Sequence, residues 1–319
     1  MAALGLFVLS GCGSAESRVR RSAPAEGAPR VLCVVAHPDD ETAFGGTLFK
    51  IATHLGGVCD IVVITNGEAG YKYTTLAEVI YRRRLTDPVT GRSELPAIRQ
   101  REMREAADIL HVRDVVFLSE QDHRYTLDPK EVIGDGATIW NVPRIRAELA
   151  RVLAAERYDF VLAHLPVATS HGHHQAATIL ALEAIAALPL DRRPVPLGSF
   201  WQPKERKPDD RPPPPFVLDG FPITAQRNDV GPWSFDSTQP FGFEGKLDYR
   251  IVKSWAVAAH KSQGMHQRMM GRGELESFRL FAVEVPDAVA KVDALFRRLA
   301  EPQFANVQYD ADGKLIREN

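Results

Sequence analysis

Three consecutive acidic residues follow a histidine at the end of an apolar run, in the stretch VVAHPDDETAFGG at 34–46. Neighbouring carboxylates repel one another unless a positive group, such as a metal ion, lies among them. His37 and Asp40 are three residues apart in a turn that enters a predicted helix, a spacing that brings two side chains to one face. An imidazole and a carboxylate suit zinc or a similar divalent ion, so this turn is a candidate metal site.

A second histidine-rich stretch, SHGHHQ at 170–175, has the same spacing, because His171 and His174 are three residues apart at the start of another predicted helix. Asp39 and Asp40 are neighbours whose side chains diverge, so we expect one aspartate to bind the ion and the other to transfer protons. Each cluster also has a structural interpretation. Asp40 could cap a helix, and the histidines could lie in a solvated loop.

Strand and helix signals alternate along the chain, and the strands read as continuous apolar runs. Such strands are covered by helices on both faces, which predicts an α/β fold with a Rossmann-like, doubly wound, mostly parallel sheet. Ligands bind beyond the carboxyl ends of such strands, where both clusters fall. The predicted strands are 31–36, 59–65, 114–118 and 159–163, and the predicted helices are 43–56, 97–110, 141–156 and 173–188.

The pattern changes after residue 190, where prolines become frequent. We expect a Pro-rich insertion around 190–245 whose first part, DRRPVPLGSFWQPKERKPDDRPPPPF, is a surface excursion that contains neither helix nor interior strand. A helix over 246–261 and a strand over 277–285 follow. Residues 30–319 are expected to form a single domain.

Composition excludes some classes of protein. With 319 residues, 45% of them hydrophobic, and a formal charge of −2, the chain can form a sizeable core but lacks the basic surface of a general nucleic-acid binder. Cys33 and Cys59 lie within apolar runs, so we expect buried thiols and no disulfide. The basic run Arg82 to Arg84 reads as a solvated helix face.

The first residues, MAALGLFVLSGCGSAES, resemble a bacterial lipoprotein signal in which cleavage precedes a lipidated cysteine, here Cys12. Residues 1–29 would then be a signal segment and flexible tether, and the protein would be anchored by lipid in the cell envelope, outside the cytoplasm. An uncleaved, disordered N-terminus is the alternative.

Five motifs in order together resemble the PIG-L/LmbE family of zinc-dependent N-deacetylases. They are AHPDDETAFGG, TNGEAG at 65–70, IRQREMREAADIL at 98–110, HGHHQAA at 171–177 and AHKSQ at 259–263. The resemblance implies one zinc ion per chain, with His37, Asp40 and His174 as ligands. Another divalent ion could replace zinc.

The resemblance also implies the catalytic roles. Asp39 would be the general base for a water whose pKa is lowered by zinc, and His171 would stabilise the oxyanion and protonate the leaving amine. Arg99 and Glu102 match an R-x-x-E pattern of the family. Where the family has proline and aspartate between the two histidines, this chain has Gly172 and His173, so His173 could replace a neighbour.

The implied substrate is a small N-acetylated sugar, an N-acetylglucosamine-type conjugate that loses acetate and gains a free amine. Two alternatives remain. One is another metal-dependent hydrolase, such as a phosphoesterase with a two-metal site. The other is a non-catalytic carbohydrate-binding lipoprotein on the same fold.

Overall fold

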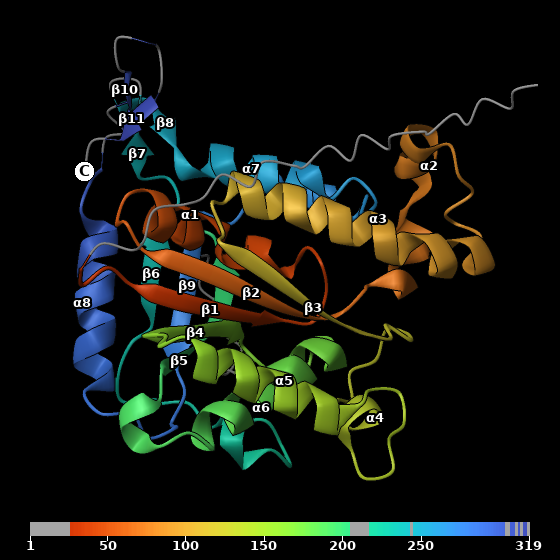
Figure 1. Cartoon of the computed structure of the whole chain (residues 1–319), viewed down its shortest axis with the longest axis horizontal. Coiled ribbons are helices and arrows are strands. Elements are labelled where there is room, and N and C mark those ends of the chain that lie inside the picture. The colour runs from red at the N-terminus through yellow and green to blue at the C-terminus, as the bar shows by residue number, and fades with distance from the viewer. Residues whose placement is uncertain are drawn as a thin grey trace, which may run out of the picture.

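The central sheet of the protein has seven strands among the residues that the computed structural model describes, which are 26–204, 217–242, 245–303, 307–309, 312 and 315–317. The strand order is β3-β2-β1-β4-β5-β9-β6 (Figure 1). Strands β3 to β5 run parallel, while β9 is antiparallel to both of its neighbours. The strands are β1 (Arg30–Val35), β2 (Val58–Thr65), β3 (Asp114–Glu120), β4 (Phe160–His164), β5 (Val195–Gln202), β6 (Trp233–Asp236) and β9 (Leu275–Leu280).

Helices cover both faces of this sheet, which confirms the predicted α/β fold. In Figure 1, α1, α3 and α7 lie on one side of the sheet and α4, α5 and α6 on the other. The helices are α1 (Gly45–Thr53), α2 (Thr75–Tyr81), α3 (Pro88–Ile109), α4 (Lys130–Ile133), α5 (Val142–Ala155), α6 (Gly172–Ala186), α7 (Tyr249–Ala259) and α8 (Ala288–Ala300). Short 3-10 segments are η1 (Asp40–Phe44), η2 (Glu68–Tyr73), η3 (Leu190–Arg192), η4 (Pro222–Thr224) and η6 (His266–Met269).

Strand β1 shows why the sheet is buried on both sides. Val31, Cys33 and Val35 point into the core shared with α1, α3, α7 and α8. Leu32 and Val34 point into the core shared with α5 and α6. A strand with two apolar faces has no polar alternation, which is the sequence pattern that predicted it. Cys33 and Cys59 are buried free thiols, as expected.

The prediction that the proline-rich stretch after residue 190 contains no interior strand was wrong for β5, which pairs with β4 on one edge and β9 on the other. Pro196 is the second residue of the strand. Val195 N–H donates to the Asp159 carbonyl, Pro196 only accepts, from Phe281 N–H, and the pairing with β9 begins at Leu197. The ladder therefore does not need the N–H that proline lacks.

The remaining strands form two small sheets. They are β7 (Pro240–Phe241) with β8 (Leu247–Asp248), and β10 (Val307–Tyr309) with β11 (Leu315–Arg317). No helix among the described residues is both long enough and apolar enough to cross a bilayer. Cys12 and the rest of the proposed signal segment up to residue 25 lie outside the described residues.

The strand order reverses between β1 and β4. Strands β2 and β3 extend to one side of β1, and β4 and β5 extend to the other. Connections that leave β1 and β4 therefore turn to opposite faces of the sheet, which opens a crevice at their carboxyl ends. Both sequence clusters, one after β1 and one after β4, lie at this crevice.

Candidate metal centre and active site

The turn after β1 fixes Asp40 through the backbone. Asp40 Oδ2 accepts hydrogen bonds from Ala36 N–H at 3.0 Å and His37 N–H at 2.8 Å. Oδ1 receives no such backbone bond and faces His174 Nε2 at 3.1 Å. One oxygen therefore anchors the side chain to its own turn and leaves the other for a ligand.

The predicted ligands His37, Asp40 and His174 lie together, with candidate ligand atoms within 4.8 Å of one another. His37 Nδ1 is 3.1 Å from His174 Nε2 and 3.6 Å from Asp40 Oδ2. Ligands at about 2.0 to 2.1 Å around a tetrahedral zinc ion are separated by about 3.3 Å. The donor set and these spacings therefore fit a zinc-sized cation.

Two buried polar atoms beside this group lack hydrogen-bond partners within the described part of the chain. His164 Nε2, at the end of β4, is 3.7 Å from Asp40 Oδ1. Asp122 Oδ1, in the segment after β3, is 3.9 Å from His37 Nε2. Buried unpaired donors and acceptors are costly, and a cation bound at Asp40 Oδ1 would lie close to His164 Nε2, whereas Asp122 Oδ1 faces the other ring nitrogen of His37.

A second group, His37, His171 and His173, also meets the distance criterion for a metal site. The rings of His37 and His171 are stacked at 5.0 Å and 12°, so lone pairs in the two ring planes do not converge on one point. His173 is fully buried, with Nδ1 3.3 Å from Asp122 Oδ1 and Nε2 3.3 Å from His123 Nδ1. These contacts favour His174 over His173 as the ligand from α6.

Burial and neighbouring side chains shift the pKa values of Asp40 and His174. Burial alone would raise the pKa of Asp40, but His174, His164 and His37 hold it well below its usual range. Burial is the largest effect on His174 and lowers its pKa. Asp40 is thus an ionised carboxylate and His174 a neutral imidazole at neutral pH, which are the protonation states that a metal requires.

His171 lies between two aromatic rings, stacked on Tyr125 at 4.8 Å and on His37 at 5.0 Å. Burial, followed by the neighbouring imidazoles, lowers the pKa of His171 to about 3. Nε2 is 3.3 Å from the Arg124 carbonyl, which can only accept a hydrogen bond. His171 is therefore neutral at pH 7, with the proton on Nε2, and its acid role remains a prediction.

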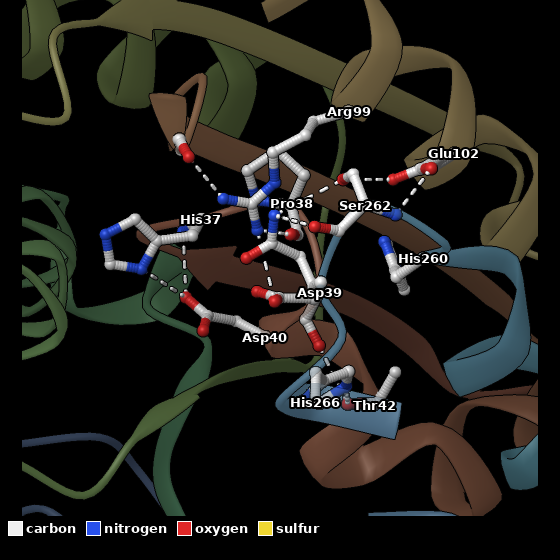
Figure 2. Close-up of polar contacts among 12 residues, drawn as sticks. His37, Pro38, Asp39, Asp40, Thr42, Arg99, Glu102, His260, Ser262 and His266 are labelled. Atoms are coloured by element: carbon white, nitrogen blue, oxygen red, sulfur yellow. Dashed lines mark hydrogen bonds and ion pairs between the residues drawn. The ribbon is translucent and has the colours of Figure 1, made fainter. Parts of the chain in front are cut away.

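The Asp39 side chain forms no hydrogen bond or ion pair with His37, Asp40 or His174; it pairs with Arg99 instead. Its carboxylate Oδ2 is 3.1 Å from Arg99 Nη2, and Arg99 also donates to the carbonyls of Gly67 and Pro38 (Figure 2). Arg99 is buried on α3, whereas the Asp39 side chain keeps 16% of its surface exposed. The guanidinium therefore orients a carboxylate that still reaches the cleft.

The backbone at Asp39 has φ 129°, in a region that residues with a side chain rarely adopt. Glu41 stabilises it, because Glu41 Oε2 accepts from Asp39 N–H at 3.1 Å. Glu41 Oε1 in turn accepts from His260 Nε2–H at 2.6 Å, and both side chains are fully buried. Although burial opposes protonation, Glu41 raises the pKa of His260. The third acid of the opening motif is thus a support for Asp39.

A related network joins α3 to the AHKSQ segment. Glu102 accepts from Ser262 N–H at 2.9 Å and from Ser262 Oγ–H at 2.6 Å, as Figure 2 shows. Tyr81 O–H also donates to Glu102, at 2.6 Å. His266, after the same segment, lies 2.9 Å from Thr42 Oγ1. These contacts hold the far end of the chain against the HPDD turn.

A cleft of about 410 Å³ opens above these groups. His37, Asp40 and His174 line it together with Asp39 and Arg99. Its rim includes Lys72, Tyr73, Tyr125, His266 and Arg272. The volume is that of a small-molecule site.

Several of these residues escaped the site prediction. His164 and Asp122 follow predicted strands, which is the signal that could have identified them. Nothing local marks the pairing of Glu41 with His260, because the two residues are 219 positions apart.

A family model matches the part of the chain that contains the three predicted metal ligands, and a curated relative is similar over about half of the chain. The family model described as PIG-L, GlcNAc-PI de-N-acetylase, matches residues 32–185. The chain is 26% identical over 165 residues to a protein of Bacillus anthracis named probable N-acetyl-alpha-D-glucosaminyl L-malate deacetylase 2. That match covers 51% of this chain and 62% of the relative, so it spans less than two thirds of the relative's length.

Solved structures are similar at low identity. The 4-carboxy-2-hydroxymuconate hydratase of Pseudomonas putida KT2440 has a TM-score of 0.49 at 17% identity, covering 79% of this chain and 95% of that one. The N,N'-diacetylchitobiose deacetylase from Pyrococcus horikoshii has a TM-score of 0.43 at 20% identity, covering 82% of this chain and 87% of that one. The residues matched by the PIG-L family model, 32–185, include β1, the HPDD turn and the histidines of α6, so the chain is similar to this family over the part that contains the candidate site.

Proposed function

We propose that this protein is a metal-dependent deacetylase that hydrolyses the N-acetyl group of an N-acetylglucosamine-type conjugate and releases acetate and a free amine. One observation carries the proposal. A partly exposed carboxylate, Asp39, lies in the same cleft as a convergent donor set of two imidazoles and one carboxylate. The match to the PIG-L family model and the name of the Bacillus relative support the reaction and the class of substrate.

In this proposal His37, Asp40 and His174 would hold the metal. Zinc bound there would supply a water of lowered pKa and a charge that polarises the acetamide carbonyl. The protein prepares for the metal through the Asp40 turn, because the backbone bonds to Oδ2 restrict the carboxylate to one orientation.

Asp39 would accept the proton of the attacking water. Arg99 aligns its carboxylate, and the Glu41 bond to its N–H stabilises the backbone conformation that presents the side chain to the cleft. A general base of this kind accelerates a reaction by about 10² to 10⁴.

His171 would act at the leaving nitrogen. Its Nε2–H is bonded to the Arg124 carbonyl, so Nδ1 is the basic nitrogen. Because the ring is neutral in the free site, Nδ1 would first take up the proton that Asp39 removes from the attacking water and then deliver it to the departing amine. Its stacking between Tyr125 and His37 restricts rotation of the ring during this transfer.

The test is release of acetate from a panel of N-acetylated amino sugars, measured with the native protein, after chelation and after zinc is returned. We expect turnover that depends on one tightly bound ion per chain. Two ions per chain together with phosphate ester hydrolysis would favour the phosphoesterase alternative. Binding of acetylated sugars by zinc-loaded protein without acetate release would favour the non-catalytic alternative. A lipid anchor at Cys12 and a location in the cell envelope remain predictions from the sequence.

A further inference from the structure

Helix α2 and the residues after it expose an unusual amount of apolar surface. Leu76, Val79 and Ile80 are 68%, 82% and 57% exposed, and Val89, at the start of α3, is 80% exposed. The three α2 residues have the i, i+3, i+4 spacing of one helix face, which is normally the face turned to the core. Here the inward side chain is Ala77, which is fully buried. The helix therefore has a second apolar face, which is turned to solvent.

Cations border this apolar face. Residues 72–89 contain four cations, Lys72 and Arg82 to Arg84, against two carboxylates, Glu78 and Asp87, and Asp87 caps α3 by accepting from Thr90 N–H. Glu78 is already an acceptor for Thr86 N–H at 2.7 Å and for Thr86 Oγ–H at 2.6 Å. Within the described residues Arg83 pairs with Glu94, and no carboxylate lies within ion-pair distance of Arg82 or Arg84. The surface is thus apolar at its centre and positively charged at its edge.

This surface is continuous with the rim of the cleft. Lys72 and Tyr73, which line the cleft, directly precede α2. Tyr73 O accepts from Gly264 N–H at 3.1 Å, which brings the exposed Met265 to the same border. Figure 1 shows α2 at the edge of the molecule, next to the amino-terminal end of α3 and away from the sheet.

The charge pattern of this surface favours an anionic bilayer over a second copy of the chain as its binding partner. In a symmetric dimer the same patch appears on both partners, so the arginines of one copy would oppose those of the other. An anionic bilayer matches both parts of the surface. Apolar side chains of an interfacial helix enter the boundary between head groups and acyl chains, and arginines bind the lipid phosphates.

We propose that α2 with its flanking residues, Lys72 to Val89, is a peripheral docking surface for an anionic phospholipid bilayer. The docking orients the cleft rim towards the membrane surface. It is separate from the predicted lipid anchor at Cys12 and does not depend on the proposed deacetylation.

The test follows one residue of the surface with a fluorescent label that responds to polarity. Cys33 and Cys59 are buried, so the full chain carrying Cys12→Ser and Val79→Cys offers one accessible thiol and no site for an acyl chain. Phosphatidylglycerol vesicles should raise the emission of the label and shift it to shorter wavelength, while pure phosphatidylcholine vesicles should have little effect. Leu190→Cys, at the exposed Leu190 of η3, is the matched control and should not respond.

Charge variants measure the electrostatic part of the binding. Replacing Arg82, Arg83 and Arg84 by glutamine should lower the partition coefficient by roughly a hundredfold, since each arginine near an anionic surface contributes about fivefold. High salt should have a similar effect. The matched control replaces three exposed arginines of α5 and its end, Arg146, Arg151 and Arg157, by glutamine and should bind like the parent. Thermal unfolding of each variant verifies the fold.

Three outcomes would overturn the proposal. The label at position 79 could stay exposed to water with anionic vesicles, or it could respond equally with neutral vesicles. It could also become shielded without lipid as protein concentration rises, which would assign the surface to a second copy of the chain.

Discussion

Replacing Asp39 by asparagine separates metal binding from proton transfer. The change preserves the shape of the side chain and removes its basicity. Asp39 bonds to Arg99, Glu41 and Thr42, and to none of the three predicted metal ligands. The metal content should therefore equal that of the parent. The loss of a general base should lower kcat by about 10² to 10⁴, which corresponds to about 3 to 5 kcal/mol in the barrier.

The effect on stability should be much smaller. Arg99 keeps its bonds to the Gly67 and Pro38 carbonyls, and the asparagine oxygen can still accept from it. The ion pair becomes a hydrogen bond from the guanidinium to a neutral amide oxygen, which costs about 1 kcal/mol in the free energy of unfolding.

The assay combines acetate release, metal analysis of the same sample and urea unfolding, with Asp191→Asn, an exposed aspartate of η3, as the matched control. A fully metallated Asp39→Asn variant with the turnover of the parent would refute the general-base role. Loss of the metal together with activity would instead make Asp39 part of the metal site.

Removing the metal by chelation should abolish acetate release and lower the unfolding midpoint, because a ligand of the native state stabilises it; full turnover of the chelated protein would contradict the proposal. Glu41→Ala should lower the free energy of unfolding by about 3 kcal/mol in urea titrations, since it leaves His260 buried without its partner, and unchanged stability would count against the support of Asp39. Gly67→Ala would bring Cβ to 2.0 Å from Arg99 Nη1 at a positive φ, so we expect at least a tenfold loss of kcat, roughly the low end for a displaced catalytic group, with the metal retained. The folded-state pKa of His171 is about 3 against an ordinary 6.5, so the unfolded chain binds the proton first and the stability of metal-free protein should fall as pH drops from 6.5 towards 3; His171→Gln should reduce that slope in unfolding curves.

The parallel part of the sheet was predictable from local sequence. Strands β1, β2 and β4 are short apolar runs without polar alternation, and that pattern follows directly from burial on both faces. Strand β5 was not predictable in the same way, because Pro196 normally marks a strand edge. The strand can contain Pro196 because its pairing with β9 begins only at Leu197, and local sequence does not reveal where that pairing begins.

Part of the candidate site was likewise predictable from the sequence, and part of it required the structure. Residue types and spacing made His37 and Asp40 candidate metal ligands, and the resemblance to the PIG-L/LmbE family implied His174 as the third. The structure brings the three together. The choice between His173 and His174 required the structure, since the burial of His173 and its contacts with Asp122 and His123 distinguish the two.

By itself the sequence determined the α/β class, the two clusters that could bind a cation, and the strand ends at which they lie, because each depends on residues close together along the chain. Only the tertiary structure decided the partners of the acids. Asp39 meets Arg99 from α3, and Glu41 meets His260 from the segment after α7. Such pairs form when the sheet and its helices bring distant side chains together, and burial makes them strong, because a charge removed from water must find a partner within the protein.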